Sequence, residues 1–404
     1  MSFSKYLVWL FFIIACVQQA FLFPDISLIP GERANLFSGV LCCVAFISAL
    51  TILKIRGNSV RLSEVVISVT LASLAFASSA LSATPGVSFA RSFVIISSML
   101  GGYWTSRLLL NNVESRLFFQ RVCLVLLFCI IFLTFAGILT GGNVYQFIDS
   151  GAHQVVSRIL ILSFAPISFL FGTSFSVFLT GVVSLIVTYC CLVALDYYGT
   201  VRTGLVIPFG LSFLAIFFIK KTKKILIPFF AILLICLLGA STLFFWHSQK
   251  NAKESQSVAY RIENIFFSTY LAIKHPLLGI GPSSPRAGFV NDYDIKYPFS
   301  TKDTFREWSD NVRTSENTIF TLLADLGFPF VILYLSALFC LLWRLARLAW
   351  RPPLHYIPAP LALLLAIIGS FVHFQVFDGP YLPQISWFLH ILLGMVLFSP
   401  PDPK

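Results

Sequence analysis

The sequence predicts an all-α fold: a polytopic bundle of transmembrane helices with one large loop outside the membrane. Of the 404 residues, 57% are apolar and only 11% are charged, whereas soluble domains average about 45–50% and 25%. A soluble fold has too little interior for so much apolar surface, so the excess must face lipid. The composition therefore excludes a disordered chain, a DNA-binding module and a disulfide scaffold.

Runs of apolar residues long enough to cross a bilayer provide the second observation, since a spanning helix needs about 20 residues. The first run is not followed by a small-residue cleavage site, so we interpret it as a span and not as a signal peptide. The twelve predicted spans are 6–23, 35–53, 64–82, 88–106, 120–140, 154–172, 175–195, 203–219, 225–246, 318–342, 358–376 and 384–399.

The basic residues provide the third observation, because they gather on the even-numbered connections. Cytoplasmic loops carry an excess of Lys and Arg, which places both termini in the cytoplasm. This sidedness also explains the net charge of +11 without nucleic acid as a partner. The basic residues concerned are Lys5, Lys54, Arg56, Arg61, Arg107, Arg116, Arg121, Lys220, Lys221, Lys223, Lys224, Arg344, Arg347, Arg351 and Lys404.

The chain divides into three predicted parts: spans one to nine in 1–246, a large periplasmic loop in 247–316, and spans ten to twelve in 317–404. Long loops are exempt from the charge rule, so the basic residues of this loop do not contradict the orientation. Within the loop, 258–275 carries apolar residues at close to helical spacing, which predicts an amphipathic helix on the bundle or at the interface. These apolar residues are Ile262, Ile265, Phe266, Tyr270 and Ile273.

Cysteines and histidines give no sign of a metal site. The nine cysteines lie inside apolar runs and act as small hydrophobic residues. His373 and His390 lie in the last two spans, where they can form polar contacts between helices. We therefore expect chemistry without a metal or another cofactor.

Three arginines, Arg91, Arg158 and Arg202, lie near the outer ends of predicted spans, at similar depth. Ionisable groups within the membrane are candidates for function, although long side chains near helix ends can also reach the interface. Guanidinium groups match phosphate oxygens and stay charged. A pyrophosphate on a lipid carrier would lie at this level, and glycosyl transfer outside the cytoplasm needs such a lipid-linked donor.

Carboxylates at the outer face are the second half of a predicted site. Glu316 precedes the tenth span, Asp310 lies just upstream, and Asp378 lies in the last outer connection. A carboxylate can accept the proton of an acceptor hydroxyl as it attacks the anomeric carbon. As alternatives, Glu316 can stabilise the start of the tenth helix, and Asp378 can be a structural turn residue.

Three stretches resemble the bacterial O-antigen ligase and polymerase superfamily of integral-membrane glycan enzymes. The first is 201–205, Val-Arg-Thr-Gly-Leu, and the second is Arg261 followed by 272–281 with its Pro-Leu-Leu-Gly-Ile-Gly sequence. The third is 316–327, from Glu-Asn-Thr to Leu-Ala-Asp-Leu-Gly, at the end of the loop. Their order and spacing match the pattern of the superfamily, and the likeness covers about 200 to 345.

The resemblance implies roles for residues and partners. Arg202 and Arg261 correspond to arginines that hold an undecaprenyl-pyrophosphate donor, and Glu316 corresponds to the residue that activates the acceptor. We thus expect catalytic roles for Glu316, Arg202 and Arg261, and substrate-binding roles for Arg91, Arg158, Asn317, Asp310 and Asp378. The expected partners are the lipid-linked oligosaccharide, an acceptor glycan or lipid A-core, membrane lipids and a chain-length regulator, in the bacterial inner membrane.

One departure from the superfamily favours a particular member. The ligase pattern has His where this chain has Glu316, which argues against a His-based ligase mechanism and favours a polymerase of repeat units. Transfer would be metal-independent and inverting. A ligase and a transporter of lipid-linked sugars stay open as alternatives, but a transporter predicts charges near the midplane and broken helices there.

Overall fold

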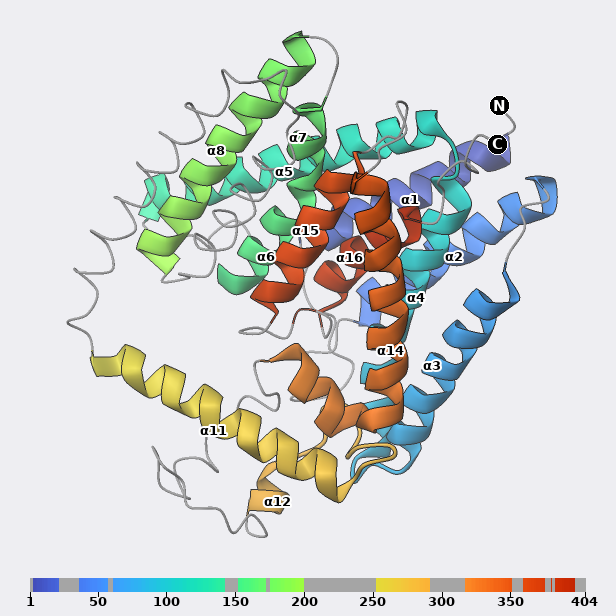
Figure 1. Ribbon diagram of the computed structural model, residues 1–404, viewed down its shortest axis with the longest axis vertical. Helices are drawn as coiled ribbons and strands as arrows, with labels where there is room; N and C mark the ends of the chain where they lie inside the picture. The colour runs from blue at the N-terminus through green and yellow to red at the C-terminus, as the bar shows by residue number, and fades with distance from the viewer. Residues whose placement is uncertain are drawn as a thin grey trace. The chain divides into compact units, whose positions relative to one another are not determined.

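The computed structural model describes residues 3–21, 36–56, 61–141, 152–171, 175–199, 252–290, 317–350, 359–374, 379 and 382–396. Every regular element within these ranges is a helix (Figure 1), so the predicted all-α class is confirmed for them. The helices are α1 (Phe3–Phe21), α2 (Leu36–Arg56), α3 (Leu62–Ala80), α4 (Pro85–Leu109), α5 (Val113–Gly141), α6 (Ala152–Leu162), α7 (Phe164–Phe169), α8 (Phe175–Gly199), α11 (Ala252–Lys274), α12 (Ala287–Val290), α14 (Thr318–Trp350), α15 (Pro360–His373) and α16 (Pro383–Met395).

Ten of the twelve predicted spans coincide with these helices, and the spans at 203–219 and 225–246 lie outside the described residues. Among the described residues, four helical stretches are long and apolar enough to cross a membrane: Leu62–Ala80, Val113–Thr140, Phe175–Leu195 and Thr318–Ala349. Shorter apolar helices occur in α1, α2, α6–α7 and α15. The protein is therefore integral to a membrane, while the number of twelve spans and their orientation remain predictions.

The sixth predicted span is interrupted at one residue. It consists of α6 and α7, with Ser163 between them. Pro166 has no backbone N–H, so the carbonyl of Leu162 four residues earlier loses its helical partner, and α6 ends at that residue. The next predicted division, at 172–174, does separate α7 from α8.

The chain forms two compact units. Unit 1 comprises Met1–Asn111, Lys253–Leu342 and Phe374–Leu397, and unit 2 comprises Asn112–Ala252, Trp343–His373 and Phe398–Lys404. In unit 1, α4 packs against α2, α3 and α16, and α1 packs against α2 and α16. In unit 2, α5 to α8 pack against one another, and α15 packs on α6 and α7. The predicted three-part division of the chain stays a prediction.

Helix α4 occupies the interior of unit 1, and its small residues allow close packing. A Cβ atom on Gly102 would lie 2.7 Å from the carbonyl oxygen of Trp387, and one on Gly394 would lie 2.5 Å from that of Tyr103. Small residues at helix interfaces let backbones approach in membranes. Because α4 is covered by protein, it tolerates Arg91 and several buried serines among its apolar residues.

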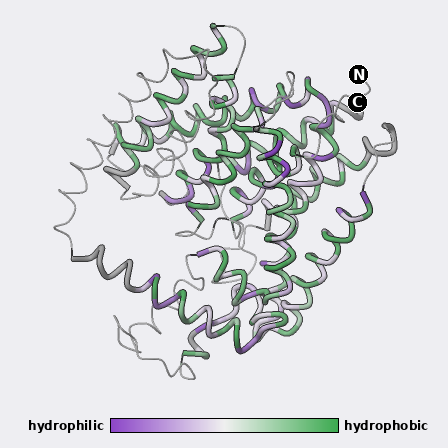
Figure 2. Tube along the Cα trace, viewed as in Figure 1, coloured by the Kyte–Doolittle hydropathy of each residue, from purple (hydrophilic) through white to green (hydrophobic). Residues whose placement is uncertain are grey.

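The amphipathic helix predicted for 258–275 is α11, which begins six residues earlier at Ala252. Figure 2 shows more hydrophilic residues along α11 than along α8 or α14. Phe267 and Leu271 are buried in a cluster with Ile280, Val290 and Ala324. Three of the predicted apolar residues lie on a different, exposed face of the helix: Ile262, Phe266 and Ile273. That face is free to contact the membrane interface.

Candidate functional site

A break in α14 creates the structural centre of the candidate site. Gly327 has φ 78° and ψ 173°, which is not helical, and Pro329 follows two residues later. Proline cannot donate to the carbonyl four residues before it, and that residue is Asp325. The N–H of Phe328 donates to the carbonyl of Pro276 at 2.9 Å, so the carbonyl of Ala324 also lacks this helical partner. The broken helix therefore offers two carbonyls to another segment.

The loop after α11 occupies this break. The N–H of Ile280 donates to the carbonyl of Ala324 at 2.9 Å, and the N–H of Gly281 donates to that of Asp325 at 3.0 Å. Both segments belong to stretches that carry the superfamily resemblance, 272–281 and 316–327. We call residues 276–286 and 324–328 together the junction. The two stretches, far apart in the sequence, thus form one structure.

The junction requires glycines because the backbones of the loop and of α14 approach each other closely there. A Cβ atom on Gly279 would lie 2.4 Å from the carbonyl carbon of Asp325, and one on Gly327 would lie 2.6 Å from that of Leu277. Gly279 has φ 65°, so both glycines adopt backbone conformations that other residues rarely take. Any larger residue at either position would separate the loop from α14.

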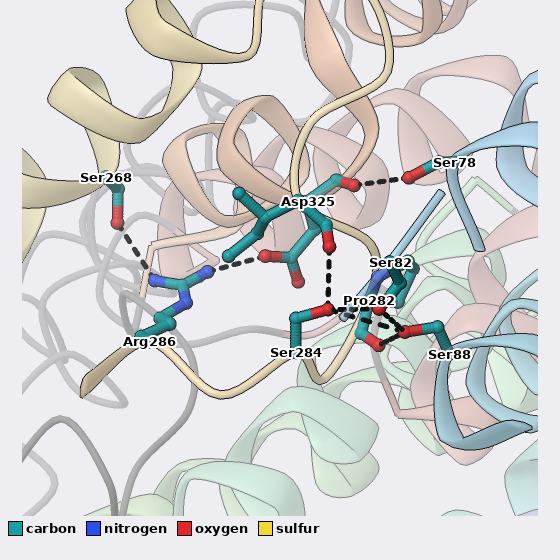
Figure 3. A network of polar contacts seen from close by, with 9 residues as sticks. Ser78, Ser82, Ser88, Ser268, Pro282, Ser284, Arg286 and Asp325 are labelled. Carbon is teal, nitrogen blue, oxygen red and sulfur yellow. Dashed lines mark hydrogen bonds and ion pairs between the residues drawn. The ribbon is translucent and has the colours of Figure 1, made fainter. Parts of the chain in front are cut away.

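A buried ion pair joins the end of the loop to α14 (Figure 3). Arg286 Nη2 lies 2.8 Å from Asp325 Oδ1, and both side chains are 1% exposed. Arg286 Nη1 donates to the hydroxyl of Ser268 on α11 at 3.0 Å. A single guanidinium group therefore connects α11, the loop and α14. A buried charge is tolerated when it is paired and hydrogen-bonded, as it is here.

Serine hydroxyls connect the junction to α3 and α4. Ser78 on α3 donates to the carbonyl of Asp325 at 2.7 Å. Ser82, at the turn between the two helices, lies 2.6 Å from Ser284, and Ser88 on α4 donates to the carbonyl of Pro282 at 2.8 Å. Figure 3 shows these contacts around the loop. The junction is thus held by two further helices through short polar contacts.

Arg261, predicted to bind the donor, lies on α11 and is half-buried. It precedes Ser268 by seven residues, which places both on one face of the helix, about 10 Å apart along its axis. Since Ser268 binds Arg286, the junction fixes the face of α11 from which Arg261 projects.

Asn317 caps the N-terminus of α14. Its Oδ1 accepts from the N–H groups of Ile319 and Phe320 at 3.2 and 3.4 Å, and Thr318 donates its N–H to the carbonyl of Phe374 at 2.9 Å. The N-cap position is therefore occupied by Asn317 and not by its neighbour Glu316. Glu316 lies outside the described residues, as do Arg202, Asp310 and Asp378.

The other two predicted arginines lie on different units. Arg91 belongs to unit 1 and is half-buried on α4, one turn after Ser88 and on the same side of the helix. Arg158 belongs to unit 2, where it is 1% exposed on α6. The structure thus places Arg91, Arg261 and Asn317 in the unit that contains the junction.

Two histidines make contacts between helices, as predicted. The Nε2 atom of His373 lies 3.2 Å from the carbonyl oxygen of His153 on α6. The Nε2 atom of His390 lies 3.3 Å from the hydroxyl of Tyr334 on α14. Within the part of the chain that the structure describes, no three His, Cys, Asp or Glu side chains gather in a way that could hold a metal ion.

Comparison with known families supports the resemblance drawn from the motifs. Residues 168–335 match the family model Wzy_C, described as O-antigen ligase. Over these residues the chain is similar to the O-antigen ligase family. The matched segment contains Arg202, Arg261, Glu316 and the whole junction, so the resemblance to the O-antigen ligase and polymerase superfamily is confirmed there. No curated protein matches the chain.

The sequence did not predict the roles of Arg286, Asp325 and the serines. Arg286 was one of several charges in a nearly neutral loop, and Asp325 was only part of a motif. The Gly327 and Pro329 pair inside a predicted span is the signal that could have indicated a helix break and freed carbonyls.

We expect Asp325→Asn to destabilise the protein strongly, because Arg286 would remain buried without its counter-charge. Breaking one partner of a buried ion pair costs about 3–5 kcal/mol. Thermal unfolding of the purified protein in detergent measures this loss. The double change of Arg286→Met and Asp325→Leu removes both charges and should unfold at a higher temperature than Asp325→Asn. Equal unfolding temperatures for Asp325→Asn and the wild type would contradict the structural role of the pair.

Proposed function

We propose that the protein is a membrane glycosyltransferase that polymerises lipid-linked repeat units of O-antigen or exopolysaccharide at the periplasmic face. The donor is an undecaprenyl-pyrophosphate-linked glycan, and transfer is metal-independent and inverting. The observation that carries this proposal is the junction, in which two stretches of the segment that matches the O-antigen ligase model interlock. This arrangement fixes α11, which carries Arg261, relative to the start of α14, which follows Glu316.

In the proposed reaction, Arg202 and Arg261 bind the pyrophosphate of the donor, with Arg91 or Arg158 as a further contact. Guanidinium groups neutralise the charge that grows on the leaving group. The acceptor hydroxyl oxygen forms a bond to the anomeric carbon as the bond from that carbon to the pyrophosphate oxygen breaks. Glu316 takes the proton of the hydroxyl, and undecaprenyl pyrophosphate leaves. Asn317, Asp310 and Asp378 complete the substrate-binding site.

Two observations support a role for Glu316 as the base. The N-cap of α14 is already provided by Asn317, so the helix does not need the Glu316 side chain for this purpose. Its position corresponds to the activating residue of the superfamily. A chain-length regulator is a further partner of such a polymerase.

A ligase that transfers the finished glycan to lipid A-core is the second candidate. The description of the matching family model, O-antigen ligase, favours it. The two candidates share the donor and the proposed arginine contacts, but they differ in the acceptor. Glu316 in place of the expected His is the reason to prefer the polymerase.

We expect a strain without this protein to make lipopolysaccharide capped with a single repeat unit, without the ladder of longer chains. The reason is that a polymerase joins repeat units before their transfer to the core. A glycan gel, together with a lipid extract probed for carrier-linked sugar, measures this. Bare core with long carrier-linked glycan on the outer face would indicate the ligase. Accumulation of single carrier-linked repeats on the cytoplasmic side would overturn both enzyme proposals in favour of a transporter.

Arg202→Ala and Arg261→Ala should each lower transfer by about 10²–10³-fold, the usual loss when one donor to a developing negative charge is removed. Ladder formation in the complemented deletion strain is the measurement, with membrane levels determined by immunoblot. Arg121→Ala, a matched loss of an exposed arginine on α5, should restore the full ladder. Full ladders from both test variants at normal protein level would refute the pyrophosphate contact.

Glu316→Gln should lower transfer by about 10²–10⁴-fold, because the amide cannot accept the acceptor proton. Glu316→Asp keeps the carboxylate and should retain part of the activity. Incorporation of labelled repeat units by membranes from each strain gives the rates. Normal rates from Glu316→Gln would show that the side chain does not act as the base.

A further inference from the structure

A second candidate site lies in unit 1, at the other end of α3 from the junction. It is a pocket of about 290 Å³ between α3, α4, α14 and α16. Most of its wall is apolar and includes Ile67, Leu71, Met99, Leu338 and Leu393. Ser336 and Cys340 also line it and are exposed, so the pocket is open to the surroundings of α14.

The polar end of the pocket lies about the length of α3 away from the junction. This end is at Glu64 near the start of α3, whereas Ser82 of the junction follows the end of that helix. Eighteen residues of helix rise about 27 Å, which is close to the roughly 30 Å of a hydrocarbon core. The polar end of the pocket therefore lies at headgroup level, in the cytoplasmic leaflet on the predicted orientation.

Glu64 lines this end of the pocket and carries a buried acceptor. Its side chain is 9% exposed. Oε2 accepts from the hydroxyl of Tyr103 at 3.2 Å and from Arg107 Nε at 3.1 Å. Oε1 is buried and accepts no hydrogen bond from the residues that the structure describes, since Arg61 Nε is 3.8 Å away. Buried carboxylate oxygens normally have a hydrogen-bonded partner.

The other polar side chains deep in the pocket are satisfied within the protein. Ser68 accepts from Trp104 Nε1 at 3.0 Å, and Tyr334 and His390 contact each other at 3.3 Å. Arg61 differs from them, because its side chain is 57% exposed at the rim. The pocket thus combines an apolar wall, a buried carboxylate oxygen that accepts no hydrogen bond from the described residues, and an exposed guanidinium group.

We propose that this pocket binds a phospholipid with a primary amine headgroup, of the phosphatidylethanolamine type. The ammonium group donates to Glu64 Oε1, and Arg61 binds the adjacent phosphate. One acyl chain lies along the apolar wall. A volume at the lower end of the roughly 300–1,000 Å³ range of ligand pockets suits one chain segment and not a whole lipid.

The charges at the rim favour a zwitterionic headgroup. Arg107 binds Glu64 Oε2, whereas Glu64 Oε1 and the exposed guanidinium group of Arg61 are opposite charges 3.8 Å apart, which the ammonium and the phosphate of one headgroup can match. Glu64 Oε1 accepts no hydrogen bond from the described residues, and an ethanolamine ammonium supplies an N–H donor close to the phosphate. A trimethylated choline headgroup has the same charge but no N–H to donate.

The test compares lipids that differ only in the headgroup. The full-length protein in detergent is titrated with phosphatidylethanolamine, phosphatidylcholine or phosphatidylglycerol of identical acyl chains, and bound lipid is counted by native mass spectrometry. We expect about tenfold tighter binding of the ethanolamine lipid than of the choline lipid, the usual effect of one charge-assisted hydrogen bond. Equal binding of these two lipids, or equal binding of the glycerol lipid, would overturn the proposed amine contact.

Two variants locate the binding. Glu64→Gln should abolish the preference for the amine headgroup, whereas Glu114→Gln, an exposed glutamate at the start of α5, should leave it unchanged. Ser336→Trp keeps Glu64 and Arg107 but fills the pocket, and it should weaken binding of both lipids about tenfold. Unchanged binding by Ser336→Trp would place the lipid elsewhere. None of these measurements depends on glycosyl transfer.

Discussion

The structure of the candidate site depends on one constraint: backbone polar groups inside a membrane protein need partners, because lipid offers none. The break at Gly327 releases the carbonyls of Ala324 and Asp325, and the loop after α11 supplies their N–H donors. These hydrogen bonds between the loop and α14 are local and directional. They attach a loop from a hydrophilic segment to a membrane helix at one defined register, without a β-strand or a disulfide.

Once the loop is attached, the side chains around it lie in surroundings of low polarity, so the buried polar and charged groups among them need partners within the protein. Arg286 is buried, so it needs the carboxylate of Asp325 and the hydroxyl of Ser268. Small serine side chains satisfy the remaining groups and also allow α3 and α4 to approach closely. The same contacts that satisfy buried polar groups therefore hold α11 in place, and α11 carries Arg261.

Most of the helical framework could be predicted from the sequence, because a span requires a long apolar run whatever its neighbours are. The prediction was less successful where the surroundings decide. The buried face of α11 consists of Phe267 and Leu271, not of the stripe with Ile262 and Phe266. Both faces are apolar, and periodicity alone does not tell which one contacts protein.

The candidate site was predictable in its motifs but not in its contacts. The glycines of 272–281 and 316–327 are part of the motifs, yet their role of letting two backbones meet is revealed only by the fold. The Arg286–Asp325 pair spans 39 residues, and no local pattern marks charges that will be buried together. Glu64 presents the same difficulty at the other end of α3. Its place at the start of a predicted span does not indicate that one of its carboxylate oxygens is buried beside an apolar pocket without a hydrogen bond from the described residues.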